Sequence, residues 1–348
     1  MRGQISTVLR GLSVSKRVTV AAILCGLLGL VPYLARTQEQ NEVEEASPQA
    51  PLTGVTSSTQ NPLQIAILRW YDANLTTHFS VGTKPFGVAF AGATIWVTNK
   101  GDDTVSELEA NDGGLLGTIG VGAGPQGLAF DGANVWVANQ KSNTVTKLQA
   151  SDGVPLGTFG GVITPFGVAF DGTDIWVTDG TPKGSVTKLR VSDGAVLGTF
   201  PVGNSASAVM FDGTNIWVAN FGSNTVTKLA TGGAVLGTFG VGIQPIGLAF
   251  DGANVWVANS GSNTVTKLRA SNGRLLGTFG AGSRPEGVAF DGANIWVANL
   301  SSNNVTKLRA SDGTRLGTFS VGAGPVGVAF DGANIWVANN SSNTVSKL

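Results

Sequence analysis

The stretch FDGANIWVANNSSNTVSKL, residues 330–348, decides the fold because it is the last of seven copies of one phrase. In the six earlier copies, the chain continues through a turn into a segment resembling LGTFxVG. The last copy ends at residue 348 without that segment. Two questions follow: what structure one copy forms, and where the missing segment of the last copy lies.

Each copy predicts four short strands. The segments GVAF, IWVAN, NTVTKL and LGTFxV recur in this order and are separated by turn signals such as DGAN and SDG. Asp-Gly between apolar runs favours hairpins, because Gly accepts the positive φ of the primed turns. Val, Ile, Thr, Phe and Trp are residues that strands prefer. One Trp marks each copy, at intervals of 39–41 residues: Trp96, Trp136, Trp176, Trp217, Trp256, Trp296 and Trp336.

The burial pattern of the four segments indicates how the copies assemble. GVAF and IWVA are apolar on both alternating faces, so both faces must be covered. NTVTKL alternates, with its Lys on one side, and we expect the later strands to approach solvent. A period of about 40 residues with four strands is typical of a β-propeller. An open β-solenoid is the alternative, although its repeats are usually shorter.

The number of segments predicts seven blades and a closed ring. The first, second and third segments each occur seven times. The fourth also occurs seven times, but its first copy, LTTHFSVG at 75–82, precedes every first segment. This strand can complete the last blade and leave no open edge. The predicted fold class is therefore all-β, a seven-bladed β-propeller closed by an N-terminal strand that completes the last blade.

The N-terminal region predicts a membrane anchor. Residues 1–17 are basic and contain no acid, and residues 18–35 carry no charge. Eighteen helical residues rise ~27 Å, enough to cross a bilayer core. The basic segment is expected in the cytoplasm, with the propeller outside it, periplasmic or extracellular. A cleaved signal peptide, which would give a secreted protein, is the alternative. Residues 36–68 predict a flexible linker, and 69–348 the propeller.

Composition argues against several classes of function. Lys plus Arg equals Asp plus Glu, at 22 each, which argues against a nucleic-acid binder. Cys25 is the only cysteine, so neither an intrachain disulfide nor a cysteine-rich metal site is possible. His78 is the only histidine, which excludes chemistry that needs two imidazoles. The sequence predicts no cofactor, no metal and no catalytic residue.

The repeated phrases resemble a known family. VGxxPxGVAF, IWVTN at 95–99 and NTV as at 143–145 resemble YVTN-type β-propeller repeats, and the wider group includes NHL and streptogramin-lyase-like propellers. The resemblance covers residues 75–348 and implies the propeller fold. Members of the group include receptors, surface proteins, sensors and some enzymes. The lyase members use a histidine-containing site near a divalent metal, and no GVAF, IWVAN or NTVTKL segment of this chain contains a histidine.

Two series of residues that recur in the copies have a structural interpretation. We expect the Trp series to pack between blades, because each ring buries a large area. We expect the Asp that precedes Gly in the DGAN turns to cap backbone N–H groups, because six carboxylates around a ring lie too far apart to share one metal ion. His78 is expected to be structural. The Asp series is Asp131, Asp171, Asp212, Asp251, Asp291 and Asp331, with Ala91 in the first copy.

The positions at which the copies differ predict a binding surface. One variable position precedes the Gly of GVAF, and the other follows the Asn of WVAN. Both belong to loops that emerge on one face of a propeller, around the mouth of the central channel. Diversity on one face of a constant scaffold is typical of a binding surface. With nearby polar candidates added, the predicted binding residues are Phe86, Lys100, Gln126, Gln140, Phe166, Asp179, Phe221, Ile246, Arg284, Glu286 and Leu300.

Three functions are compatible with this pattern. We favour a non-enzymatic module that binds a protein, peptide or glycan through the loop face. The first alternative is a lyase- or lactonase-like enzyme with a carboxylate-bound divalent metal in the channel. The second is a structural protein of the cell envelope that associates with its own copies. Converging carboxylates at the channel mouth would favour the enzyme, whereas a mouth without them would argue against it.

Overall fold

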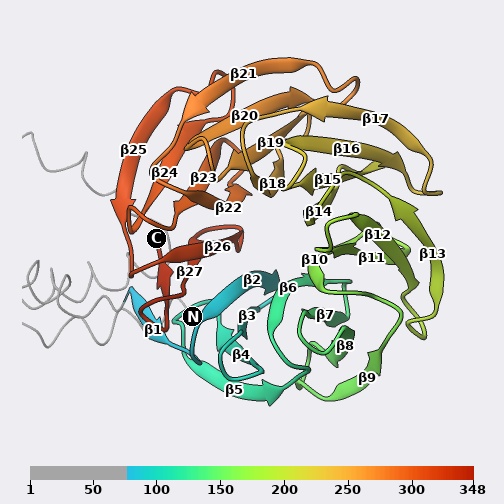
Figure 1. Cartoon of the computed structure of the whole chain (residues 1–348). Coiled ribbons are helices and arrows are strands. Elements are labelled where there is room, and N and C mark those ends of the chain that lie inside the picture. The colour runs from blue at the N-terminus through green and yellow to red at the C-terminus, as the bar shows by residue number, and fades with distance from the viewer. Residues whose placement is uncertain (1–76) are drawn as a thin grey trace, which may run out of the picture. The chain divides into compact units, whose positions relative to one another are not determined.

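Every copy of the repeat forms one four-stranded antiparallel sheet in the computed structural model, which describes residues 77–348. Seven sheets stand around a central axis as the blades of a propeller (Figure 1). Blade 1 contains β2 (Pro85–Ala91), β3 (Thr94–Asn99), β4 (Thr104–Glu109) and β5 (Leu115–Gly120). The first strand of each blade lies nearest the axis and contacts the first strand of both neighbouring blades around the complete ring. The predicted all-β, seven-bladed propeller is confirmed.

The other blades repeat this order of strands. Blade 2 contains β6 (Pro125–Phe130), β7 (Asn134–Asn139), β8 (Thr144–Gln149) and β9 (Pro155–Phe159). Blade 3 contains β10 (Pro165–Phe170), β11 (Asp174–Asp179), β12 (Ser185–Arg190) and β13 (Val196–Pro201). Blade 4 contains β14 (Ala206–Phe211), β15 (Asn215–Asn220), β16 (Thr225–Ala230) and β17 (Val235–Gly240). Blade 5 contains β18 (Pro245–Phe250), β19 (Asn254–Asn259), β20 (Thr264–Arg269) and β21 (Leu275–Gly280). Blade 6 contains β22 (Pro285–Phe290), β23 (Asn294–Asn299), β24 (Asn304–Arg309) and β25 (Arg315–Ser320).

Blade 7 combines strands from the two ends of the described chain. It contains β26 (Pro325–Phe330), β27 (Ile335–Asn339), β28 (Thr344–Lys347) and β1 (His78–Ser80). β1 pairs antiparallel with β28, with His78 opposite Ser346 and Ser80 opposite Thr344. Three residues of the segment 75–82 therefore occupy the fourth position of this sheet. Residues 75 and 76, like the predicted anchor at 18–35 and linker at 36–68, lie outside the described residues.

Glycines in the first strands allow the blades to approach closely at the axis. A Cβ placed on Gly127 would lie 2.6 Å from the backbone oxygen of Phe166 in the next blade, and a Cβ on Gly167 would lie 2.6 Å from that of Ser207. Real Cβ atoms do not come so close to a backbone oxygen, so a larger residue would force the blades apart. The ladder between the first two strands is also irregular here, with register shifts between Pro125 and Leu128 in blade 2. The irregularity falls at the variable residue before each Gly.

The core consists of apolar layers between and within the blades. Six of the seven repeated Trp side chains are completely buried, which confirms the expected packing role. In each blade whose fourth strand carries a Phe, that ring lies beside the Trp ring of the same sheet. The centroids of Trp136 and Phe159 are 5.6 Å apart, and those of Trp336 and Phe79 of β1 are equally close. Within residues 77–348 there is no helix with the length and apolar character needed to cross a membrane.

Candidate functional site

A cavity of about 400 Å³ opens at the face where the first strands begin and the second strands end. This is the face predicted to bind, and we call it the channel face. The cavity brings together eight of the eleven predicted residues: Phe86, Gln140, Phe166, Phe221, Ile246, Arg284, Glu286 and Leu300. Gly180, Ser205, Ala206, Ser207 and Val326 complete its lining. The walls therefore come from every blade of the ring.

A narrower cavity of about 180 Å³ continues along the first strands. Phe86, Phe166, Ile246, Glu286 and Val326 line both cavities, so the two form one channel with its mouth at the channel face. Glycines of the first strands and apolar residues that follow them line the narrower part. The channel is consequently apolar along most of its wall, with one carboxylate, that of Glu286.

Two aromatic rings meet across the mouth. Phe86 and Phe166 pack edge to face, with ring centroids 5.5 Å apart and planes at 85°. They belong to blades 1 and 3, so their contact spans the position of blade 2. An edge-to-face pair is a favourable aromatic geometry and contributes about 0.5–1.5 kcal/mol beyond the area it buries. Both side chains remain half-buried and accessible from the cavity.

Glu286 is the only carboxylate of the cavity, and Arg284 holds it. Nε of Arg284 donates to Oε1 of Glu286 at 3.0 Å. Glu286 is 5% exposed, and this burial raises the pKa of its carboxyl group, while the charge of Arg284 opposes the rise. The side chain of Arg284 itself is 58% exposed. The pair thus places a buried anion in the wall and an accessible guanidinium at the rim.

The other three predicted residues lie around the cavity without lining it. Gln126 is fully buried, and its Nε2 donates to Oε1 of Gln140 at 2.6 Å. The ammonium of Lys100 lies 5.5 Å from the centroid of the Phe86 ring. Asp179 accepts hydrogen bonds from the hydroxyl groups of Thr164 and Ser185 and from the backbone N–H of Thr181. Its carboxylate therefore fixes the divergent loop of blade 3.

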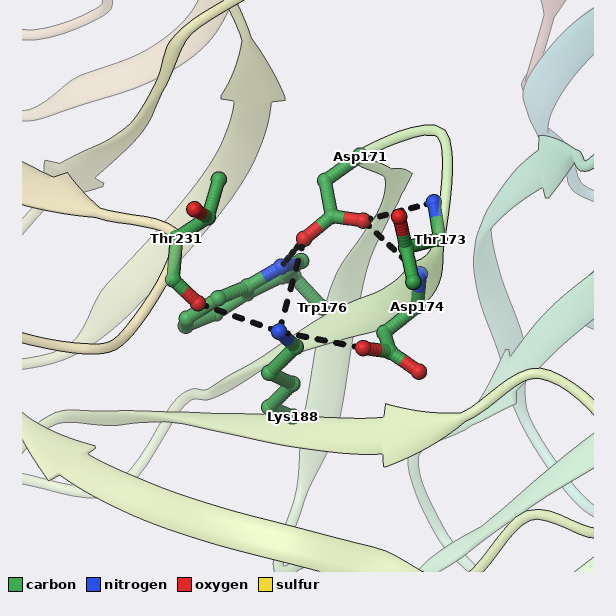
Figure 2. A network of polar contacts seen from close by, with 6 residues as sticks. All are labelled: Asp171, Thr173, Asp174, Trp176, Lys188 and Thr231. Atoms are coloured by element: carbon green, nitrogen blue, oxygen red, sulfur yellow. Dashed lines mark hydrogen bonds and ion pairs between the residues drawn. The ribbon is translucent and has the colours of Figure 1, made fainter.

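A second polar network recurs at the opposite face, and Figure 2 shows its copy in blade 3. Asp171 accepts hydrogen bonds from the backbone N–H groups of Thr173 and Asp174 at 2.9 and 2.7 Å, which confirms the capping role expected for this series. Its other oxygen accepts from Nε1 of Trp176 at 2.7 Å, a contact that the sequence had not indicated. The same carboxylate thus fixes the turn and orients the buried indole.

The lysines of the third strands differ from the sequence expectation. They were expected on a strand approaching solvent, but Lys147, Lys228 and Lys267 are less than one-tenth exposed. In blade 3, Lys188 donates to the carbonyl oxygen of Thr231 in blade 4 at 3.0 Å, and its ammonium lies 5.4 Å from the centroid of the Trp176 ring (Figure 2). The acceptor in the next blade and the indole beneath the ammonium replace the water that a lysine normally requires.

This inter-blade lysine bond recurs at five interfaces. The donor–acceptor distances are 2.6–3.0 Å. Trp and Lys stand directly opposite each other in the register of the second and third strands, as Trp176 and Lys188 do in blade 3. That cross-strand pairing is the signal in the sequence that could have revealed the contact. The donors are Lys147, Lys188, Lys228, Lys267 and Lys347.

Blade 1 replaces three members of this network. Ala91 stands in place of the Asp, and Thr94 accepts the hydrogen bond of Trp96 Nε1 at 2.9 Å. Glu107 occupies the position of the lysine, opposite Trp96 in the strand register. It is 8% exposed, and burial raises the pKa of its carboxyl group. This copy therefore carries a carboxylate where the other six carry an ammonium.

In the part of the chain from 77 to 348, no three side chains of His, Cys, Asp or Glu come close enough to form a metal site. The cavity at the channel face combines apolar walls with a rim of hydrogen-bonding groups. Such a surface can hold a ligand by burying part of it and can orient it through Gln140, Arg284 and Lys100.

Comparison with known proteins supports the fold. No protein-family model matches the sequence, and no curated protein matches it. Among solved structures, streptogramin B lyase superposes with a TM-score of 0.67 and 18% identity over 78% of this chain and 95% of that one. Hydrazine synthase of Kuenenia stuttgartiensis gives a TM-score of 0.67 and 18% identity over 77% and 97%. At this identity the likeness shows a shared β-propeller fold, and membership of the YVTN or NHL group stays a prediction.

Proposed function

We propose that this protein is a non-enzymatic binding module that accepts an apolar side chain of a protein or peptide in the cavity of the channel face. The observation that carries the proposal is the composition of that cavity. Phe86, Phe166, Phe221, Ile246 and Leu300 differ between copies of an otherwise constant repeat, and they converge on one space of about 400 Å³. A concave, mostly apolar site with a few polar groups is the usual form of a ligand site.

The physical basis of binding is the removal of apolar surface from water. Full burial of a Phe or Leu side chain contributes about 1.5–3 kcal/mol. The scaffold positions the cavity in advance, because the first strands are held by close backbone contacts around the axis. Little ordering of the protein is therefore needed when a ligand enters, which favours affinity.

The proposal can be tested with a neutral apolar probe, 3-phenylpropan-1-ol, titrated into the full-length protein. Methyl groups of Ile246, Leu300 and Val326 report on the cavity when they are isotope-labelled and followed by NMR. We expect saturable shifts at these methyls. We expect the substitutions Phe166→Ala and Phe221→Ser to weaken binding about tenfold each, which corresponds to about 1.4 kcal/mol.

The matched control is Leu116→Ser, on the outer strand of blade 1, where the side chain is 53% exposed. It removes an apolar side chain far from the cavity and should leave the dissociation constant unchanged. Thermal unfolding of each variant separates a loss of binding from a loss of folding. If the cavity methyls do not respond, or if the control weakens binding as much as Phe166→Ala does, the proposed function is wrong.

We also propose that the propeller lies outside the cytoplasm and is tethered by residues 18–35. The support is the uncharged length of this segment and the basic residues that precede it. Protease added to intact cells or spheroplasts should digest the propeller, and mass spectrometry of the mature N-terminus should distinguish an anchor from a cleaved signal. Protection of the propeller until the membrane is lysed would contradict this location.

A further inference from the structure

The carboxylates on the loops of the channel face are already engaged by the protein. Asp102 accepts hydrogen bonds from the loop that enters blade 1, and Asp103 accepts from the loop that enters blade 2. Asp179 fixes the loop of blade 3. Glu286 is held by Nε of Arg284. The acidic groups of this face thus already accept hydrogen bonds from donors of the protein itself.

Three cations of the same face form a cluster beside the cavity. Lys84, Lys100 and Lys141 constitute this lysine cluster; the backbone of Lys100 donates to the carbonyl oxygen of Lys84 at 3.1 Å. Burial lowers the pKa of Lys100, and the charges of Lys141 and Lys84 lower it further. Among the described residues, no ion pair includes any of the three. The three ammonium groups therefore form no ion pair and repel one another.

The lysine cluster adjoins the apolar wall directly. The ammonium of Lys100 lies 5.5 Å from the centroid of Phe86, whose ring lines both parts of the channel. Arg284 supplies a further cation, at the rim of the cavity in blade 6. Its Nε is committed to Glu286, and this contact orients the exposed guanidinium, whose terminal nitrogens can donate to an anion. Positive groups thus flank the apolar site.

We infer that the ligand carries a carboxylate next to the apolar group that enters the cavity, as an acidic peptide segment does, and that the lysine cluster beside Phe86 binds this carboxylate. The inference rests on the proposed binding function and specifies its ligand class. A cationic ligand is less compatible with the site, because it would have to displace Arg284 from Glu286 and would approach three lysines. A lysine-bound carboxylate instead relieves repulsion among the three ammonium groups.

Three probes with one apolar part and different head groups test the inference on the full-length protein: 3-phenylpropanoate, 3-phenylpropan-1-ol and 3-phenylpropan-1-ammonium. We expect the carboxylate to bind about fivefold more tightly than the alcohol at low salt, and the ammonium to bind more weakly than either. Raising the salt from about 50 mM to about 500 mM should remove the advantage of the carboxylate, because partly exposed charges are screened.

Charge-neutralising variants locate the effect. Lys100→Gln and, as an exposed second variant, Lys141→Gln should bring the ratio of carboxylate affinity to alcohol affinity down toward one. Lys183→Gln is the matched control: it removes the same charge from a loop of the same face, in blade 3, outside the lysine cluster. We expect it to have no effect.

The outcomes separate the two proposals. Equal binding of carboxylate and alcohol, or tighter binding of the ammonium, overturns the inference and leaves the binding function intact. If Lys183→Gln weakens the carboxylate as much as Lys100→Gln does, the lysine cluster is not the site of recognition. If none of the three probes binds the cavity, the proposed function and the inference both fail.

Discussion

The interface of blade 3 with blade 4 and the interface of blade 1 with blade 2 share one backbone framework but have a lysine and a glutamate, respectively, at the same position of the third strand. In blade 3, Lys188 donates to blade 4 and pairs with Asp174 at 3.0 Å and Asp171 at 3.7 Å (Figure 2). In blade 1, Glu107 stands at the lysine position and Ala91 at the aspartate position. Burial raises the pKa of Glu107, so its ionised form is disfavoured there. The fold therefore tolerates the loss of a contact that it uses at most interfaces.

The interface of blade 6 with blade 7 lacks the lysine bond for a different reason. Lys307 is present, with its ammonium 4.5 Å from the centroid of Trp296 and 3.9 Å from Asp291. The acceptors of the other lysines lie at the turn between the third and fourth strands of the next blade. Blade 7 has no such turn, because its fourth strand is β1. Trp296 is 7% exposed, whereas the other six indoles are completely buried. The contact requires both the lysine and the turn.

The largest expected effect comes from deleting residues 75–82, which removes β1 and leaves blade 7 with three strands. The deletion removes both the β1–β28 pairing and the contact of the partly buried Phe79 with Trp336; for comparison, replacing one fully buried Phe by Ala typically costs about 3–5 kcal/mol. We expect the deletion to destabilise the domain by at least that amount and to lower its unfolding temperature in calorimetry. The control deletes eight residues, 46–53, within the predicted linker. Equal unfolding temperatures for the two deletions would show that β1 does not hold the ring closed.

The second effect compares Lys188, which pairs with two carboxylates, with Lys147, which forms no ion pair within residues 77–348. Lys188→Met leaves Asp171 and Asp174 without their cation, and breaking such a partly buried group costs about 3 kcal/mol. Lys147→Met in blade 2 is the matched variant, because Asn134 replaces the second carboxylate there. We expect the loss in blade 2 to be about half as large. Denaturant unfolding measures both, and a larger loss for Lys147→Met would contradict the assigned role of Asp174.

A third substitution restores the common network in blade 1. Glu107→Lys should place an ammonium over Trp96, within reach of the turn of blade 2, and stabilise the protein by about 1 kcal/mol. Glu109→Lys, on the same strand, makes the same change of charge outside the position opposite Trp96. Thermal unfolding at neutral pH compares the two variants. Stabilisation by Glu109→Lys alone would attribute the gain to net charge rather than to the contact.

The smallest effect is a dependence on pH. The folded-state pKa of Glu107 lies above its unfolded value, so the contribution of this group to stability increases as pH falls through the folded pKa toward about 4.3. Glu107→Gln, which resembles the protonated form, should be more stable than the parent at pH 7. Its advantage should shrink on acidification. The difference in unfolding temperature between the two proteins, followed as a function of pH, measures this advantage. A difference that stays constant or grows as the pH falls would contradict the prediction.

Most of the fold could be predicted because its signals are local. Asp-Gly turns, four strand-like segments and a Trp every 39–41 residues specify a blade, and seven repetitions specify the ring. The lysines were misplaced because their acceptors belong to the next copy: Lys147 reaches Val191, 44 residues away. A single repeat shows an alternating strand with an exposed face, and only the neighbouring blade reveals that this face is covered.

The residues of the candidate cavity could be predicted in part, because variation between copies is visible in the sequence alone. Variation between copies picked out eight of the residues that line the cavity, all on one face of the ring. It could not show that Phe86 and Phe166 meet across an intervening blade, which depends on the curvature of the ring. Nor could it distinguish Gln126, which is fully buried, from Gln140, which lines the cavity.

The pairing of β1 with β28 also has a consequence for the order of folding. The other six sheets join strands that are adjacent in the chain, so each can form while later copies are still being synthesised. His78 and Ser346, in contrast, are separated by the whole repeat array. Closure can therefore occur only after the last copy has been synthesised, and it carries the loop entropy of the entire ring. Until then a row of finished blades exposes an open edge at each end, and this interval is when a newly made molecule is most vulnerable to pairing with another.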